Sequence, residues 1–110
     1  MSEDGVEVVH EPESSRYVLR KQGAKIGEER YLEGEGERIL FHTVVDKEYG
    51  GQGLASRLVR EVVEDTIAAG LAVVPVCPYV AAWLPKHPEY AAHVVEPTPE
   101  HHARLGHPRS

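Results

Sequence analysis

The residues of this chain best suited to chemistry form a glycine-rich loop, "YGGQGLAS", at positions 49–56. Three glycines fall within four positions, between an apolar run typical of a strand and a run with helical spacing. The first N–H groups of a helix lack intrahelical partners, the helix dipole adds positive potential there, and glycines let an anion approach without meeting a Cβ atom. The loop therefore predicts a site for a phosphate or pyrophosphate over Gln52 to Ser56.

Two common phosphate-binding motifs do not fit this loop. A nucleotide-binding P-loop ends in Gly-Lys-Ser/Thr, whereas Gly53 is followed by leucine. A dinucleotide fingerprint needs glycine or alanine where Ser56 stands, and no acidic residue closes an apolar strand about twenty positions later. Short glycine motifs often match by chance, so a loop whose glycines only fit a helix against a sheet is an equal alternative.

The elements before and after the loop predict an α/β fold. Residues 16–45 read as three strands joined by short turns, which is typical of an antiparallel meander. The last of these runs, 38–45, is the most apolar and is expected to be the central strand. From Leu54 to Ile67 apolar residues recur in rows spaced by four, with charged residues between them, so an amphipathic helix is expected there.

A second apolar strand is expected at 71–77, and strand–helix–strand implies a parallel neighbour. Pro75 cannot donate to a strand ladder, so this strand should be at the sheet edge or leave its neighbour there. A short helix is expected to follow, with Val80, Trp83 and Leu84 packed inward.

The two ends of the chain differ in composition from the middle. Residues 1–15 are polar and acidic and predict a loose arm, and 96–110 contain three prolines and predict a disordered tail. Residues 16–95 between them are expected to form a single domain with one core.

Composition narrows the classes of partner and location. No apolar run approaches the roughly 20 residues of a membrane span, and the acidic N-terminus lacks the apolar core of a signal peptide, so a cytosolic location without membrane contact is expected. The net charge of -6 argues against nucleic acid, and an anionic ligand must be held by local groups. The single Cys77 excludes an internal disulfide, and a proline-rich tail cannot preorganise its histidines, so no metal site is expected.

Two stretches carry a resemblance to a known family. "GGQGLA" resembles the acyl-CoA-binding motif of GNAT-type N-acetyltransferases, Arg/Gln-x-x-Gly-x-Gly/Ala at the start of an amphipathic helix. With "VVPVCPY" and "HPEY", the chain from about residue 17 to 95 is similar to the minimal GNAT-like family of small N-acetyltransferase-domain proteins. The resemblance implies a truncated GNAT fold, in which an antiparallel meander leads into the loop and helix. A second, parallel strand then splays from the central one and opens a slot for the pantetheine arm, and a C-terminal helix follows.

The resemblance also implies which residues bind acetyl-CoA or coenzyme A, the expected co-substrate. The backbone of the strand before the loop binds pantetheine in the superfamily, and the loop amides bind the pyrophosphate. In this chain the matching residues are Phe41, Thr43, Val44 and Val45 on the strand, and Gln52, Gly53, Leu54, Ala55 and Ser56 in the loop. Arg57 and Arg60 follow and are expected either to add charge for the phosphates or to be part of an ordinary solvated helix face.

Two positions depart from the family pattern. Gly50 stands where the motif has its first arginine or glutamine. Leu84 stands where GNAT enzymes usually have the tyrosine that protonates the departing thiolate, and neither Tyr79 nor Tyr90 falls in that register. The usual general acid is therefore missing.

Acetyl transfer to an amine needs a neutral amine, a polarised thioester carbonyl and a proton for the leaving thiolate. A backbone N–H on Val44 or Val45 suits the second task. The narrow family carries a histidine on the first strand and a cysteine at the end of the second, which implies His42 as general base and Cys77 as general acid or acyl-accepting nucleophile. The alternatives are a packed apolar thiol at Cys77 and a His42 that faces away from the slot.

The sequence thus favours a small acetyl-CoA-dependent N-acetyltransferase acting on a primary amine, either of a protein or of a small molecule. A non-catalytic module that binds coenzyme A or acyl-CoA is the first alternative, because the tyrosine is absent. A protein-interaction domain whose glycine loop serves only packing is the second.

Overall fold

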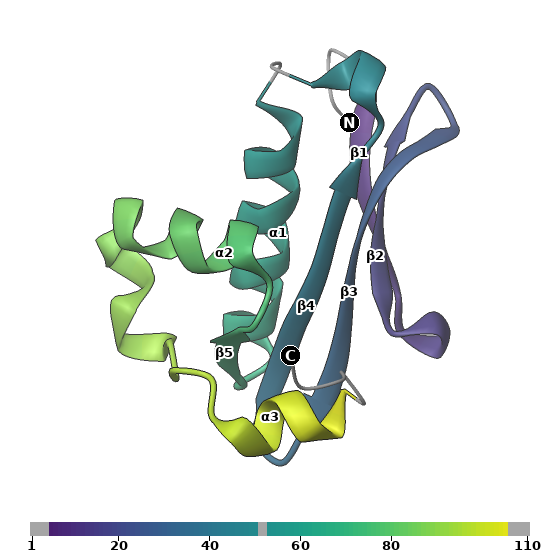
Figure 1. Ribbon diagram of the computed structural model, residues 1–110. Helices are drawn as coiled ribbons and strands as arrows, with labels where there is room; N and C mark the ends of the chain where they lie inside the picture. The colour runs from purple at the N-terminus through teal and green to yellow at the C-terminus, as the bar shows by residue number, and fades with distance from the viewer. Residues whose placement is uncertain (1–4, 51–52, 106–110) are drawn as a thin grey trace.

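The computed structural model describes residues 5–50 and 53–105, which form one sheet and three α-helices (Figure 1). The strands are β1 (Val6–Glu11), β2 (Arg16–Lys21), β3 (Ala24–Gly34), β4 (Glu37–Val45) and β5 (Ala72–Pro75). The α-helices are α1 (Leu54–Ala68), α2 (Pro78–Trp83) and α3 (Pro99–Arg104). Single 3-10 turns occupy η1 (Pro12–Ser14), η2 (Lys47–Tyr49), η3 (Leu84–Lys86) and η4 (Pro88–His93).

The sheet has the order β1-β2-β3-β4-β5, so neighbours in sequence are also neighbours in space. The first four strands pair antiparallel as a meander, and β5 joins β4 in parallel after the crossover through α1. Helix α1 covers one face of the sheet (Figure 1). The predicted fold class, an antiparallel meander followed by a helix, a parallel strand and a further helix, is confirmed.

Strand β5 lies at the edge of the sheet, where Pro75 predicted it. Its outer side is covered by the segment after η4, because the Val95 N–H donates to the Val73 carbonyl at 2.8 Å and Val94 forms a parallel bridge with Val73. Only four residues pair with β4, and a short, covered edge leaves little backbone open to another chain.

The first strand replaces most of the loose arm that we expected for residues 1–15. Val6–Glu11 pairs along its whole length with β2, and Val6 is buried. Val6 and Val8 reach the core on alternate positions, while Glu11 accepts from Arg16 Nε at 2.8 Å. Because Glu7 lies between these valines and acidic residues flank the strand, composition alone did not indicate a half-buried strand here.

The expected disordered tail, residues 96–110, also contains structure. Helix α3 begins after Thr98, whose hydroxyl accepts from the His101 N–H while the His101 ring accepts from the Thr98 N–H. The buried His101 reaches Glu37 at the start of β4, with Nε2 2.8 Å from Oε2. A capping box and two contacts to the sheet, the second from Arg104 Nη2 to the Glu33 carbonyl at 3.1 Å, thus hold a segment whose prolines suggested disorder.

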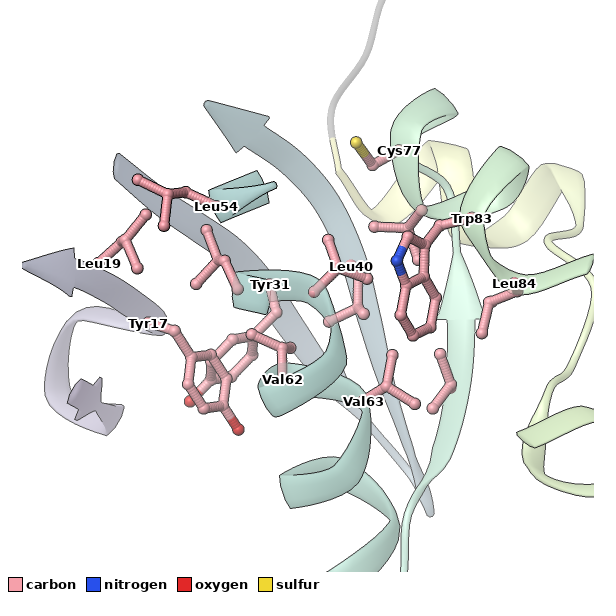
Figure 2. Close-up of a cluster of buried hydrophobic side chains, with 14 of the residues drawn as sticks. Tyr17, Leu19, Tyr31, Leu40, Leu54, Val62, Val63, Cys77, Trp83 and Leu84 are labelled. Atoms are coloured by element: carbon pink, nitrogen blue, oxygen red, sulfur yellow. The ribbon is translucent and has the colours of Figure 1, made fainter. Parts of the chain in front are cut away.

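The core lies between α1 and the sheet and continues to α2 (Figure 2). Both apolar rows of α1 contribute, since Leu58, Val59, Val62 and Val63 have no exposed surface. The side chains predicted to pack inward after β5 are buried as well: Val80, Trp83 and Leu84. The period-four pattern therefore identified the buried face of the helix correctly.

A buried arginine on β4 ties three strands to the second half of α1. The Arg38 side chain is only 5% exposed, and its Nη1 donates to the Tyr17 hydroxyl at 2.5 Å. Nη1 also lies 3.5 Å from Asp65 Oδ2 on α1, and Nη2 donates to Glu33 Oε2 at 2.5 Å. The guanidinium lies 4.6 Å from the centre of the Tyr31 ring.

We expect Arg38→Ala to lower the free energy of unfolding by about 2–3 kcal/mol, measured by urea denaturation. The change removes packing on the tyrosine rings and several charge-assisted hydrogen bonds. Glu33 and Asp65 are half exposed and can be solvated by water, which limits the loss. Arg38→Met, which refills the space, should lose less, and Arg30→Ala, an exposed residue of β3, should change stability little. An Arg38→Ala variant as stable as Arg30→Ala would contradict this role.

Candidate active site

A bulge in β4 separates the half that pairs with both β3 and β5 from the half that pairs with β3 alone. Arg30 of β3 pairs with His42 and Tyr31 pairs with Leu40, so Phe41 is the extra residue on β4. On the other side, β5 pairs with β4 only as far as Leu40 opposite Pro75. The N–H groups of the next two residues, 76 and 77, both donate to the Leu40 carbonyl, at 3.0 and 2.9 Å, and the chain then turns into α2. The predicted splay of the two strands is confirmed.

The bulge also reverses which side chains of β4 face α1. Leu40 before it is in the core, and after it Thr43 and Val45 are the residues that reach the α1 side. Val44 is 43% exposed and His42 is exposed. The structure therefore brings Thr43, rather than His42, next to Cys77, and the role of His42 as general base stays a prediction.

Cys77 lies where the two strands separate, directly before the first turn of α2 (Figure 2). Its side chain is buried, and Sγ is 3.1 Å from the Thr43 hydroxyl across the splay. Two of the predicted site residues, one from each strand, are thus in direct contact. The Thr43 hydroxyl also donates to the carboxylate of Glu29 on β3.

Glu29 was not among the predicted site residues. Its side chain has no exposed surface, and Oε2 has no hydrogen-bond partner among the described residues. Burial raises the pKa of Glu29 to about 8, against hydrogen bonds from Thr43 and the His42 backbone, and the charge of Glu28 adds to the rise. A carboxyl group that holds its proton at neutral pH therefore lies one hydroxyl away from Cys77.

The sequence carried one signal for Glu29. It occurs two positions before Tyr31, and in a strand such residues share a face. Tyr31 faces the core, so the alternation places a carboxyl on the buried side. An acidic residue on the apolar face of a strand is rare enough to be taken as a candidate for chemistry.

The start of α1 has the form expected of an anion site. Gly53 precedes the helix with φ +74°, a left-handed conformation that favours glycine, and its carbonyl accepts from the Arg57 N–H at 3.1 Å. Among the described residues no side chain caps this helix end, and its first turn has no acidic residue. The N–H groups of Leu54, Ala55 and Ser56 are therefore available to an anion in a 15-residue helix. Gln52, also predicted to bind the phosphates, lies outside the described residues.

The polar side chains near this helix end are occupied by contacts within the protein. The Ser56 hydroxyl accepts from Trp83 Nε1 at 2.7 Å, which joins α1 to α2. Arg57 donates to the Val6 carbonyl at 3.1 Å and lies 3.9 Å from Glu61. The Ser56 hydroxyl only accepts in this contact, so its proton stays available to a ligand together with the Ser56 backbone N–H.

Arg60, the second arginine of α1, is part of an aromatic cluster. It donates to the Tyr90 hydroxyl at 2.9 Å, contacts the His87 ring at 3.2 Å, and lies over the Trp83 ring. The Trp83 and His87 rings are stacked, with centres 3.8 Å apart. The inward position predicted for Trp83 agrees with this cluster, and Arg60 is fixed by it.

Gly27 of β3 permits the close approach of its partner Val45 and of Val44 at the C-terminal end of β4. A Cβ atom at this position would lie 2.7 Å from the Val44 carbonyl oxygen and 3.1 Å from Val45 Cγ2. The Val44 carbonyl belongs to the backbone and cannot move without displacing its strand. A side chain at position 27 must therefore shift Val44 and Val45, which are predicted to bind the cofactor.

We expect Gly27→Ala to lower the free energy of unfolding by about 1–3 kcal/mol and to displace Val44 and Val45. Urea denaturation measures the first effect, and backbone amide chemical shifts measure the second. Gly50→Ala is the matched control, because its Cβ atom would meet only the Lys47 carbonyl, at 3.3 Å. Equal stability of the Gly27 and Gly50 variants would rule out the close approach.

Two other kinds of site are not found in the described part of the chain. Residues 5–50 and 53–105 contain no group of three or more histidine, cysteine, aspartate or glutamate side chains arranged to hold a metal ion. None of the helices described is both long and apolar enough to cross a membrane.

A mixed sheet in which β4 and the edge strand β5 separate beside the N-terminus of a helix that Gly53 precedes defines a GNAT-type fold. Residues 16–94 match the family of GCN5-related N-acetyltransferases, and the chain belongs to this family. The match covers the meander from β2, the loop, α1, β5 and α2. The resemblance noted in the sequence is therefore confirmed at the level of the family.

The fold is also similar to a solved structure of nearly the same size. The solution structure of a GCN5-like candidate N-acetyltransferase from Staphylococcus aureus has a TM-score of 0.65 and 25% sequence identity, over 93% of this chain and 98% of that one. A candidate GNAT-family acetyltransferase from Desulfovibrio desulfuricans (22% identity, 53% and 40% covered) and an acetyltransferase from Trypanosoma brucei (16%, 90% and 66%) have TM-scores of 0.48 and 0.44. Both values are below 0.5, and the likeness in fold rests on the staphylococcal structure. No curated protein was found to match the chain.

Proposed function

We propose that this protein is an acetyl-CoA-dependent N-acetyltransferase that moves an acetyl group to a primary amine. The observation that carries the proposal is the contact between Cys77 and Thr43 at the point where β4 and β5 separate. Membership of the GCN5-related family supports an acyltransferase. Acetyl-CoA supplies the activated thioester, and the chain supplies its binding groups and the proton transfers.

Two features of the chain suit the two ends of the co-substrate. Beyond Leu40, β4 has no β5 residue paired with it in the described structure, so its edge from Thr43 to Val45 suits the amide groups of a pantetheine arm. The N-terminus of α1, which no described side chain caps, suits the pyrophosphate, and no described atom lies within 4 Å of the position of a Cβ atom at Gly53. The net charge of -6 makes such local groups necessary.

The proposed chemistry uses three parts of the site. Cys77 acts as general acid for the departing thiolate or as an acyl-accepting nucleophile. A backbone N–H of Val44 or Val45 polarises the thioester carbonyl. His42, exposed on β4, takes the proton of the acceptor amine. The acceptor reaches the thioester from the exposed side of β4 in this scheme.

A non-catalytic module that binds coenzyme A is the second candidate. Leu84, in the position of the usual tyrosine, is buried and carries no proton to give. Tyr90, the nearest tyrosine after it, donates to Glu64 at 2.5 Å and accepts from Arg60, so its hydroxyl is already occupied. Without another acid, this arrangement would bind the co-substrate and not turn it over.

Calorimetric titration of the protein with acetyl-CoA, coenzyme A, ATP and NAD tests the proposal first. Micromolar binding confined to the two CoA compounds is expected, and Gly53→Ala should weaken it, because the left-handed backbone at this position is strained for any other residue. An acceptor screen with protein amines, polyamines and small amines then separates the enzyme from the binding module. Absence of binding in a folded sample would leave the glycine loop a packing feature. A cytosolic location is an expectation that fits this co-substrate.

A further inference from the structure

We propose that Glu29 is the proton partner of Cys77 and passes a proton to the thiol through the hydroxyl of Thr43. The three side chains come from β3, from β4 and from the residue directly before α2, and they meet where β4 and β5 separate. The inference rests on the proposed function, because it specifies how Cys77 would serve as general acid. Glu29 acts through Thr43 and is a positioning residue in this sense.

The hydrogen bonds form an unbroken chain from carboxyl to sulfur. Thr43 Oγ1 bonds to Glu29 Oε1 on one side and lies 3.1 Å from Cys77 Sγ on the other. A hydroxyl both donates and accepts, so it can bond in either direction along this chain. When Glu29 is ionised, the thiol donates to the hydroxyl, which donates to the carboxylate. When Glu29 is protonated, the order can reverse.

The second carboxylate oxygen gives independent evidence for a role beyond packing. Glu29 Oε2 is buried and has no hydrogen-bond partner in the described structure. Such an atom costs free energy unless it meets another group at some stage of function. A leucine or valine at this position of β3 would complete the apolar face beside Tyr31 without that cost.

The surroundings of Glu29 favour a neutral carboxyl at rest. Glu28, the preceding residue, is the charge that acts on it, and it disfavours ionisation. Tyr17 of β2 is its cross-strand neighbour, and Thr43 of β4 is opposite on the other side. Glu29 has no ion pair among the described residues. The α1 side chains packed on this face of the sheet are apolar at every buried position except Thr66. A group in this setting stores a proton at neutral pH.

The proposed step balances in protons and charge. The Cys77 S–H bond breaks as its proton goes to the sulfur of the departing thiolate, and the Thr43 hydroxyl proton moves to Cys77 Sγ. The Glu29 carboxyl proton moves to Thr43 Oγ1. The net result is a protonated leaving thiol, an unchanged cysteine and threonine, and an ionised Glu29, which takes a proton from water before the next turnover. Glu29 thus supplies the proton that the missing tyrosine would otherwise give.

The kinetic test compares Glu29→Gln, Thr43→Val and Thr43→Ser with the wild type over pH 6–10. Glutamine keeps the shape and has no ionisable proton, so we expect kcat at pH 7 to fall about tenfold or more, with KM for acetyl-CoA unchanged. The fall of wild-type kcat above about pH 8, where Glu29 ionises, should disappear in this variant. Thr43→Val should show the same loss of kcat, and Thr43→Ser, which retains a hydroxyl between Glu29 and Cys77, should recover most of the rate that Thr43→Val loses. A Glu29→Gln enzyme with wild-type kcat and pH profile would overturn the relay.

A second measurement does not depend on turnover. Carbon-13 NMR of the glutamate side-chain carboxyls, with Glu29 assigned by its absence in Glu29→Gln, should show a titration near pH 8. Cys77→Ala removes the end of the hydrogen-bond chain and should move that midpoint by about half a pH unit or more, whereas Val76→Ala should not. A midpoint near the ordinary 4.5, or one indifferent to Cys77, would overturn the proposal. If the Glu29 midpoint shifts in Cys77→Ala but no amine is acetylated, the hydrogen-bond chain is supported and the proposed enzyme activity is refuted. If an amine is acetylated but the midpoint does not shift, the activity is supported and the relay is refuted.

Discussion

Glu29→Gln is expected to remove most of the loss of stability that the wild type suffers between about pH 5 and pH 8. The folded protein holds the Glu29 proton up to about pH 8, whereas the unfolded chain releases it near pH 4.5. Between these values the folded state binds more protons, so the free energy of unfolding falls as pH rises, and above both it is level. The wild type should lose on the order of 3–5 kcal/mol relative to the variant across this window, measured by urea denaturation at fixed pH.

Glu28→Gln is the matched control, one residue earlier on β3, and its effect has the opposite sign. Burial acts to raise the pKa of Glu28, but the hydrogen bond and charge of Lys25 and the charges of Arg16 and Arg30 outweigh it and lower the pKa. A lowered pKa stabilises the folded state above the unfolded value, and this stabilisation is lost as the pH falls through the folded value. Parallel stability curves for wild type and Glu29→Gln would show that Glu29 ionises normally.

The elements that position the site could be predicted because each is set by local pattern. The two apolar rows of α1 identified its buried face, since side chains four apart share one face of a helix. Pro75 located β5 at the edge of the sheet, because a residue without an N–H cannot serve a central ladder. The glycine loop marked the start of α1 through Gly53, which has the left-handed φ that a side chain disfavours.

The ends of the chain could not be predicted because their order depends on distant partners. The segment Val6–Glu11 has the composition of an acidic arm, and it becomes a strand because β2 offers a free edge and a place in the core for Val6. Helix α3 is held through His101 by Glu37, 64 positions earlier. The composition of a segment indicates how much apolar surface it can bury by itself. It does not indicate which partners, such as a free strand edge or a distant carboxylate, the rest of the fold provides.

The candidate site was predicted in part, and the limit was the register of β4. Strict alternation leaves open which side His42 and Thr43 face, and the bulge at Phe41 decides it by inserting one residue. Cys77 came from the resemblance, and its partner Thr43 was predicted only for its backbone. Glu29 was missed, because an acidic residue in a strand is a candidate for chemistry only if its side chain lies on the buried face, and the sequence had not been used to assign that face of β3.

Cys77→Ala should reduce kcat for acetyl transfer by about 100-fold or more while binding of acetyl-CoA stays within a few-fold of the wild type. The thiol carries a transferable proton at the point where β4 and β5 separate, and Leu84 cannot replace it. Alanine removes only a buried sulfur, so the fold should persist, which a urea denaturation curve verifies. Steady-state kinetics on an amine accepted by the wild type measure the first effect, and calorimetry measures the second. A Cys77→Ala enzyme with wild-type kcat would refute both the acid and the nucleophile role.

The two roles of Cys77 give different results when the acceptor is left out. If Cys77 accepts the acyl group, incubation with acetyl-CoA alone adds the mass of one acetyl group to the protein, and Cys77→Ala abolishes it. If Cys77 is the general acid, no adduct forms, and kcat depends on Glu29 and Thr43 as well. We expect the second result, because a carboxyl group protonated at neutral pH lies behind Thr43 and can return a proton to the thiol but is poorly suited to remove one. If no acetyl adduct forms and kcat is the same in Glu29→Gln as in the wild type, Cys77 has neither role and is a packing residue.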